Sequence, residues 1–204
     1  MKLSDILVVL CIVFSLYAWI PPEKNLAFSE YALLNGGYYT LLTGIFVHAN
    51  FIHLAGNMIF LALFGSFLED EVGSMRTAVV FFTGGILSFL LSIPFYPGAN
   101  MVGASAAIFS VMAAALLVRR SAFSLKFLSP IGPLAILFFI FNIMAVSNGE
   151  KGNIAYVSHI IGFVIGVFFG AAWNKEWKKS LLLTLLLFVI YVVLYYFLVG
   201  WLNL

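Results

Sequence analysis

Seven apolar stretches, each about as long as a bilayer-spanning helix, divide this chain of 204 residues. A helix needs about 20 predominantly apolar residues to cross the hydrocarbon core of a membrane. Hydrophobic residues make up 64% of the sequence and charged residues only 9%, whereas a soluble domain is roughly a quarter charged. This composition excludes a soluble globular protein. We predict an all-α polytopic membrane bundle with spans near residues 4–20, 51–69, 77–96, 104–119, 127–147, 155–173 and 180–202.

The basic residues predict how the spans are oriented. Eight of the ten lysines and arginines fall on the side of the membrane that carries the N-terminus. Because basic residues are enriched on the cytoplasmic side, we expect the N-terminus inside and the C-terminus outside. Lys2 and the first apolar run resemble a signal peptide, but Pro21 and Pro22 follow without a small-residue cleavage site, so we expect a retained anchor. The expected location is the cell membrane of a prokaryote.

The connections between the spans indicate a single membrane domain over residues 1–204. The longest connection, 21–50, is too apolar for a free loop and too interrupted by Gly36 and Gly37 to cross the membrane. We therefore expect an interfacial or partly re-entrant segment on the outer side. Three acidic residues follow the second span and predict a solvated helix end; they are Glu69, Asp70 and Glu71.

Four polar residues interrupt the apolar spans at a common depth. His53 and Asn57 lie within the first two turns of the second span, Ser105 begins the fourth, and His159 lies about one turn into the sixth. All three spans run from outside to inside in the predicted topology. At about 1.5 Å rise per residue, the four side chains lie a few to about 10 Å below the outer surface. Polar side chains are costly within a bilayer, so we interpret them as a functional site.

This set contains the parts of a serine hydrolase. A serine hydroxyl needs a base to become a nucleophile, and His159 is the histidine on another span that starts at the outer side. His53 and Asn57 are spaced to share one helix face. Together with the Ser105 backbone N–H they could donate hydrogen bonds to an oxyanion. Every Asp and Glu lies in a terminus or loop, so the sequence predicts a Ser–His dyad rather than a triad.

Other residues of the spans have structural interpretations. The glycines Gly162, Gly166 and Gly170 recur every four residues and predict close packing of the sixth span against small residues of the fourth. Cys11 is expected to act as a small apolar side chain. One cysteine and three histidines, without an acidic cluster in a span, predict no disulfide and no metal site. Three intramembrane serines are expected to hydrogen-bond to their own helices; they are Ser88, Ser92 and Ser110.

The polar motifs resemble the rhomboid family of intramembrane serine proteases. The resemblance lies in the His53–Asn57 pair, the Gly-x-Ser of Gly103 to Ser105, and His159 followed by spaced glycines. Three further positions also match the family: His48, Glu69 and Gly73. The resemblance covers residues 38–172. It implies a rhomboid-like bundle with a six-helix core over residues 1–174, and a linker and a seventh C-terminal helix over residues 175–204.

The resemblance also implies roles for individual residues. Ser105 would be the nucleophile, and His159 the general base and then the general acid toward the leaving amine. His53 and Asn57 would stabilise the oxyanion. Three residues would support the site. His48 would play a structural or water-organising part, Gly103 would let the loop approach the substrate closely, and Phe109 would stack on the catalytic imidazole. Phe109 stands where the family often has tyrosine, and Ala106 where it usually has glycine.

The function predicted by this resemblance is an intramembrane serine endopeptidase. It would cleave transmembrane segments of membrane proteins near the outer membrane face, within the lipid bilayer, without a cofactor, a metal or nucleic acid. One alternative is a rhomboid-like protein that binds membrane proteins, for example in quality control, without cutting them. A second alternative is a small transporter, which would have repeated halves and interrupted helices, and the sequence contains neither.

Overall fold

A computed structural model of the chain describes residues 1–20, 25–118 and 156–179, together with four single positions beyond residue 180. Every regular element among these residues is a helix, and their only strand-like contact is an isolated bridge between Phe28 and Met101. The elements in chain order are α1 (Leu3–Trp19), α2 (Glu30–Leu34), α3 (Thr40–Phe46), α4 (Phe51–Phe60), the π-helix η1 (Leu61–Gly65), α5 (Ser66–Val72), α6 (Ser74–Ser92), the 3₁₀ helix η2 (Ile93–Phe95), α7 (Ser105–Val118) and α9 (Tyr156–Trp173).

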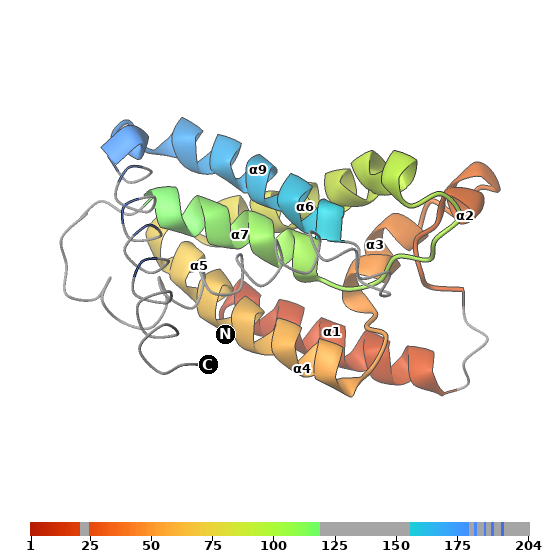
Figure 1. The fold of residues 1–204 in the computed structure, drawn as a ribbon. Helices are drawn as coiled ribbons and strands as arrows, with labels where there is room; N and C mark the ends of the chain where they lie inside the picture. Colours follow the sequence, from red (N-terminus) through yellow and green to blue (C-terminus); the bar gives the residue numbers. More distant parts are fainter. Residues whose placement is uncertain are drawn as a thin grey trace, which may run out of the picture.

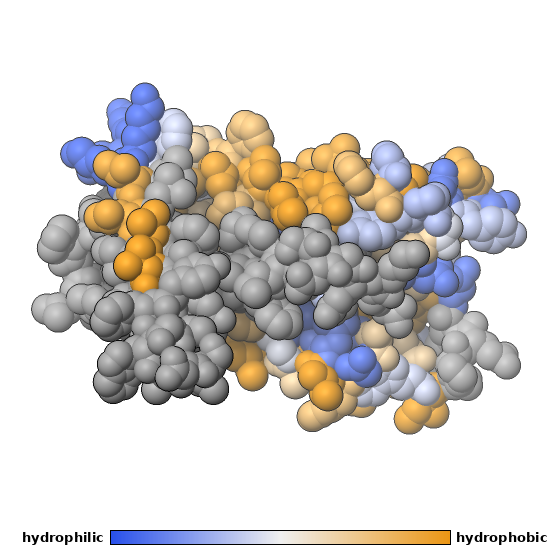
Figure 2. Space-filling model, viewed as in Figure 1, coloured by the Kyte–Doolittle hydropathy of each residue, from blue (hydrophilic) through white to orange (hydrophobic). Residues whose placement is uncertain are grey.

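Three helical stretches in this part of the chain are long and apolar enough to cross a membrane. They are Phe51–Val72, which joins α4, η1 and α5, Ser74–Phe95, which joins α6 and η2, and α9. The shorter apolar helices α1 and α7 fall on the predicted spans 4–20 and 104–119. On the face drawn in Figure 2, hydrophobic residues cover the upper middle of the described part, and polar residues gather at the upper left, at the right end and below the centre. The chain is therefore an integral membrane protein.

The described residues leave two of the predicted spans untested. The span at 127–147 lies outside the described residues, and the span at 180–202 lies almost wholly outside them. The total of seven helices, and the division into a six-helix core and an added helix, stay predictions.

Helix α7 forms the centre of the bundle. All 14 of its residues are buried, which is typical of a helix that is apolar on every side. Helices α5, α6 and α9 pack against it. In Figure 1, α4, α7 and α9 begin at the same end of the molecule and run in the same direction, while α6 runs the opposite way. The three helices with the predicted site residues thus start together, as the topology requires.

A stripe of glycines brings α9 against α7. A Cβ atom at Gly162 would strike the backbone carbonyl of Ala106, and one at Gly166 would strike that of Ser110. Gly170 continues the stripe one turn further on and is buried like the other two. Only a residue without a side chain lets the two backbones approach so closely. The predicted packing of these glycines on the fourth span is confirmed.

The expectation that Glu69 belongs to a solvated helix end is wrong. Its side chain is buried, and its carboxylate accepts hydrogen bonds from the backbone N–H groups of Leu3 (2.7 Å) and Ser4 (3.0 Å) and from the hydroxyls of Ser4 (3.0 Å) and Ser74 (2.6 Å). A carboxylate at this place satisfies two of the four N–H groups that the first turn of α1 leaves unpaired. Glu69 therefore ties the starts of α1 and α6 to α5, while Asp70 and Glu71 are exposed.

The three intramembrane serines also depart from expectation. Ser88 and Ser92 on α6 and Ser110 on α7 are buried, but their hydroxyl oxygens have no hydrogen-bond partner among the residues that the structure describes. The expected bonds to their own helices are therefore absent. Ser110 packs directly on Gly84, where its Oγ would lie 2.6 Å from an added Cβ. Small size, rather than a polar contact, accounts for serine at this helix crossing.

The long connection before α4 is folded onto the bundle. Ser29 caps α2 by accepting the Ala32 N–H at 3.1 Å. Phe28 is fully buried and pairs with Met101, because each residue donates its N–H to the carbonyl of the other at 3.0 and 2.7 Å. Tyr31 and Tyr38 remain exposed, and such aromatic side chains are enriched at bilayer interfaces. This segment is not a free loop, in agreement with the sequence.

Candidate active site

Ser105 and His159 face each other at the start of α7 and α9. The Ser105 Oγ lies 2.6 Å from the His159 Nε2, which is a short hydrogen-bond distance. Both residues are buried, with 8% and 5% of their surface exposed. The distance depends on the glycine stripe, because a serine side chain is short and reaches a histidine only where the two backbones are close. The structure thus brings together the predicted nucleophile and base.

Two aromatic rings surround the His159 imidazole. Phe109, one turn after Ser105 on α7, stacks on it with ring centroids 4.9 Å apart and an angle of 19° between the planes. Tyr156, one turn before His159 on α9, meets it edge-on at 6.1 Å and 88°. Ring stacking of this kind fixes the plane of an imidazole. Phe109 lies where the resemblance placed a stacking aromatic.

His53 reaches the same place from α4. The side chain of Asn50 caps this helix and accepts the His53 N–H at 2.9 Å, which fixes the first turn. Gly103 lies directly against the His53 ring, since a Cβ at this position would be 2.7 Å from the ring atom Cε1. Gly103 also has a φ of +117°, a conformation that other residues rarely adopt. Glycine is therefore required there on both grounds.

Asn57 is placed differently from its predicted partner. It is buried on α4, and its Nδ2 donates to the carbonyl of His53, one turn earlier, at 2.8 Å. His53 lines the cavity beside Ser105, whereas Asn57 is not among the residues that line it. Of the two predicted oxyanion donors, only His53 is directed into this cavity in the structure.

His48 lies behind the nucleophile rather than beside it. Its side chain is almost fully buried, and its Nε2 accepts the N–H of Ala104 at 3.4 Å. Its ring meets the His53 ring edge-on at 5.1 Å. Burial, together with the neighbouring His53, lowers the pKa of His48 to about 3, so the imidazole is neutral at physiological pH. This position fits the supporting role that the resemblance implied.

The turn before Ser105 is held through its backbone. Gly103 donates its N–H to the carbonyl of Gly44 at 2.8 Å, and Ala104 donates to His48. Met101 is already paired with Phe28. Among the described residues, no hydrogen bond involves the N–H of Ser105 itself. This N–H stands at the N-terminus of α7, where the helix dipole favours negative charge.

A cavity of about 490 Å³ opens over the dyad. No Asp or Glu of the described ranges lines it. Its walls come from α4, α6, α7, α9 and the segment before α7, and the lining residues are Ala49, His53, Phe89, Tyr96, Ala99, Asn100, Met101, Val102, Gly103, Ser105, Ala106, Ser158 and His159. Mostly small or apolar side chains surround the Ser105 hydroxyl in this cavity.

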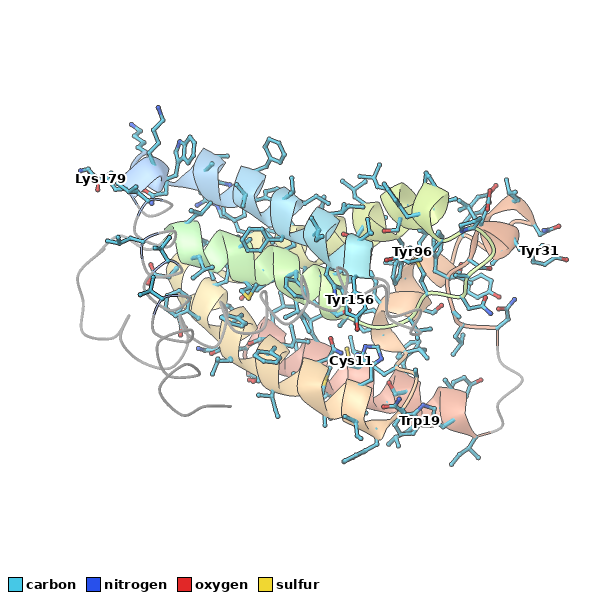
Figure 3. The ribbon with its side chains drawn as sticks, in the orientation of Figure 1. Cys11, Trp19, Tyr31, Tyr96, Tyr156 and Lys179 are labelled. Atoms are coloured by element: carbon cyan, nitrogen blue, oxygen red, sulfur yellow. The ribbon has the colours of Figure 1, made fainter. Side chains whose placement is uncertain are left out.

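The sequence did not indicate three residues that support the site. Tyr96 lies in the cavity wall, and its hydroxyl accepts the N–H of Val157 at 3.0 Å, in the first turn of α9; Figure 3 shows Tyr96 and Tyr156 near the start of this helix. Ser15 and Trp19 of α1 both bond to His48. The spacing of Ser15 and Trp19 by four residues was the one signal that could have pointed to a shared face. Tyr96 has no such signal.

Comparisons with known proteins agree with this geometry. The family model described as the Rhomboid domain matches residues 35–176. Rhomboid protease GluP of Bacillus subtilis is 35% identical over 135 residues, which cover 64% of this chain and 25% of that protein. Rhomboid-like protein 11, chloroplastic, of Arabidopsis thaliana is 36% identical over 85 residues, covering 41% and 30%.

The relatives include proteins that are named as inactive. Inactive rhomboid protein 1 of Drosophila melanogaster is 42% identical over 82 residues, which cover 39% of this chain and 6% of that protein. The chain thus spans less than a third of the length of each of these relatives. The family match itself covers well over half of the present chain. The chain belongs to the rhomboid family.

Proposed function

We propose that this protein is an intramembrane serine endopeptidase that cleaves transmembrane segments of membrane proteins near the outer membrane face. The observation that carries the proposal is the 2.6 Å distance between Ser105 Oγ and His159 Nε2. Proteins named as inactive occur among the relatives, so family membership alone does not establish cleavage. An intact nucleophile and base at hydrogen-bond distance favours catalysis over the alternative, a binding protein that does not cut.

The dyad would work as a general acid–base pair. His159 Nε2 takes the proton of Ser105 as Oγ attacks the scissile carbonyl, and a tetrahedral oxyanion forms. The protonated imidazole then gives this proton to the leaving amine, which departs and leaves an acyl-enzyme. Water, activated by His159, hydrolyses the ester and frees Ser105. Phe109 and Tyr156 would keep the imidazole plane in line with Ser105 through these steps.

The oxyanion would be stabilised by donors around the cavity. The Ser105 N–H is directed by the turn that Gly44 and His48 anchor, and the dipole of α7 adds to its effect. His53 donates from the first turn of α4. Asn57 lies outside the cavity lining and donates one amide N–H to the His53 carbonyl at 2.8 Å, so its proposed part is to hold the turn of α4 that carries His53. Loss of one oxyanion donor typically costs about 100-fold or more in turnover.

An extended peptide fits the edge of the cavity. Met101 uses both of its backbone groups on Phe28, and Gly103 directs its N–H to Gly44. Asn100 and Val102 line the cavity together with Met101 and Gly103, and because successive residues of an extended chain direct their backbone groups to opposite sides, we infer that the backbone groups of Asn100 and Val102 are the ones offered to a substrate. A substrate helix hides its amides in its own hydrogen bonds, so it would have to unwind before its backbone could pair there. Cleavage should therefore favour segments with helix-weakening residues.

Cleavage of a transmembrane peptide by the purified protein tests the proposal. Ser105→Ala and His159→Ala should each abolish cleavage. Ser110→Ala is the matched control, because it also removes a buried hydroxyl from α7. This hydroxyl has no hydrogen-bond partner in the described part of the chain. A fluorophosphonate probe should label the wild type at Ser105 and leave Ser105→Ala unlabelled. Cleavage that persists in Ser105→Ala would refute the proposal, and tight peptide binding without cleavage or labelling would favour the binding protein.

The orientation belongs to the same proposal. The distribution of basic residues supports an N-terminus in the cytoplasm, with the cavity opening toward the outer side of a prokaryotic cell membrane. With a membrane-impermeant thiol reagent, Tyr38→Cys, near α3, should be labelled in intact cells, and Lys175→Cys, after α9, only once the cells are permeabilised. Labelling of both positions from the same side would contradict this topology.

A further inference from the structure

Two side chains of α1 bind the segment that contains His48. The Ser15 Oγ lies 3.1 Å from His48 Nδ1 and donates to the carbonyl of Phe46 at 3.2 Å. Trp19, one turn later on the same face, donates its Nε1–H to the carbonyl of His48 at 2.9 Å. A serine within a helix commonly bonds to its own backbone. Here the hydroxyl is fully buried and bonds to a different segment, so it holds that segment in place.

The other ring nitrogen of His48 fixes where its proton lies. Nε2 faces the N–H of Ala104, and a backbone N–H can only donate, so Nε2 carries no proton. The neutral imidazole then carries its proton on Nδ1, which donates to the Ser15 Oγ. The Ser15 hydroxyl in turn donates to the Phe46 carbonyl. This single arrangement pairs every group in the chain of contacts from Ala104 through His48 and Ser15 to Phe46.

This chain of contacts ends one residue before the nucleophile. Ala104 is bonded to His48, and Gly103 is bonded to Gly44, so the two amides that precede Ser105 are both held from the α3–α4 side. The peptide plane that carries the Ser105 N–H joins the plane held at Ala104 through a single Cα atom, so anchoring Ala104 leaves only φ and ψ of that one residue to set where the N–H points. Any rotation of the His48 ring would release Ala104 and with it the turn that orients both the hydroxyl and the N–H of Ser105.

We propose that Ser15 is a positioning residue for the nucleophile. It holds His48 in one orientation and in the Nδ1–H tautomer, and His48 holds the Ala104 amide beside Ser105. Ser15 touches no reacting atom and lies outside the cavity lining. Its kinetic consequence rests on the proposed protease activity, whereas the tautomer of His48 is a property of the folded chain and is testable without substrate.

The kinetic test compares Ser15→Ala with Cys11→Ala. Cys11 is buried on the same helix one turn earlier and belongs to its apolar core, so its truncation reports on loss of packing alone. With rates normalised to the folded fraction, Ser15→Ala should lower kcat for a transmembrane peptide about tenfold. Its KM should change little, because the cavity walls are intact. Ser15→Thr, which keeps the hydroxyl, should restore much of kcat, and Cys11→Ala should leave it unchanged.

The spectroscopic test reads the tautomer directly. The chain has only three histidines, so nitrogen-15 labelling of histidine gives a small set of signals, and His48→Gln identifies those of His48. At neutral pH the wild type should have the proton of His48 on Nδ1, and Ser15→Ala should lose this fixed tautomer. A proton on Nε2, or an unchanged kcat in Ser15→Ala, would overturn the proposal. An inactive wild type would refute the protease assignment, while the His48 signals would still decide the tautomer.

Discussion

Gly162 offers the sharpest perturbation of the dyad, because it lies three residues after His159 at the closest approach of α9 to α7. An added Cβ would strike the Ala106 carbonyl oxygen, lie 3.0 Å from the carbonyl carbon, and lie 3.2 Å from the Ser88 Oγ. Backbone cannot yield as a flexible side chain does, so in Gly162→Ala the two helices must separate by about 1 Å at this level. The 2.6 Å contact of Ser105 with His159 would then exceed hydrogen-bond range.

The expected effect on catalysis is large and the effect on stability is modest. A misplacement of about 1 Å at a reacting pair costs about 100-fold in rate. Overpacking costs about 1–3 kcal/mol, and the better helix propensity of alanine offsets up to about 1 kcal/mol of this. We therefore expect Gly162→Ala to remain folded in detergent, with kcat for a transmembrane peptide reduced about 100-fold and fluorophosphonate labelling of Ser105 slowed to a similar degree.

Gly170→Ala is the matched control on the same glycine stripe. Its Cβ would lie 2.7 Å from the Leu117 Cβ and 3.2 Å from the Ala114 Cα, so it also overpacks the α7–α9 interface. It lies about 16 Å along the helix axis from His159, at about 1.5 Å per residue. Thermal unfolding should show similar losses for both variants, and cleavage should fall strongly only in Gly162→Ala. Equal kcat in the two variants would refute the view that glycine packing sets the dyad distance.

Three further substitutions test separate contacts. Glu69→Ala leaves the hydrogen-bond donors of Leu3, Ser4 and Ser74 without their acceptor, so thermal unfolding in detergent should show a loss of about 3 kcal/mol; an unchanged midpoint would contradict this. Tyr96→Phe removes the acceptor at the first turn of α9 and should lower kcat about three- to tenfold with little change in stability, and a wild-type kcat would exclude a role for this phenol. The pKa of His48 is lowered to about 3 in the folded state, whereas a histidine in the unfolded chain has a pKa of about 6.5. As the pH falls, the unfolded chain therefore binds the proton first, and the folded state loses stability between about pH 6.5 and pH 3. The unfolding midpoint should therefore depend less on pH in His48→Gln than in the wild type over this window, and equal slopes would contradict the lowered pKa.

The site residues were predictable because polar groups are conspicuous in apolar sequence. Ser105, His53 and His159 each lie near the start of a span, and the distribution of basic residues placed those starts on one side of the membrane. Helix direction then brought the three residues to a common depth without any knowledge of packing. The glycine stripe was predictable for a similar reason, since a four-residue spacing marks a single helix face. In each case the signal was contained within one span.

Most of the contacts that the sequence did not reveal join distant segments. Glu69 stands beside two exposed acidic residues, and only the tertiary position of the first turn of α1 shows that its carboxylate is buried. Asn57 and His53 share a helix face, but the amide of Asn57 bonds to its own helix, which a spacing of four residues permits equally well. Ser15 and Tyr96 belong to residue types that are common in membrane helices. Their partners lie far away in the chain, and although the spacing of Ser15 and Trp19 marks a shared helix face, it does not show what that face contacts.

The geometry of this site depends on close backbone approach more than on long polar side chains. Each of the three helices that carry the site is fixed by a different short contact: the Asn50 cap on α4, the amides bound by Gly44 and His48 before α7, and the glycine stripe of α9. Among the described residues, the rings of Phe109 and Tyr156 orient the imidazole where other serine hydrolases use a buried carboxylate. Unlike a carboxylate, these rings place no charge in the apolar core, where a charge is costly to desolvate. The consequence is that sensitivity to substitution should concentrate at small residues, because a single added methyl group at Gly103 or Gly162 displaces a reacting group. Large apolar side chains that face the lipid should tolerate exchange.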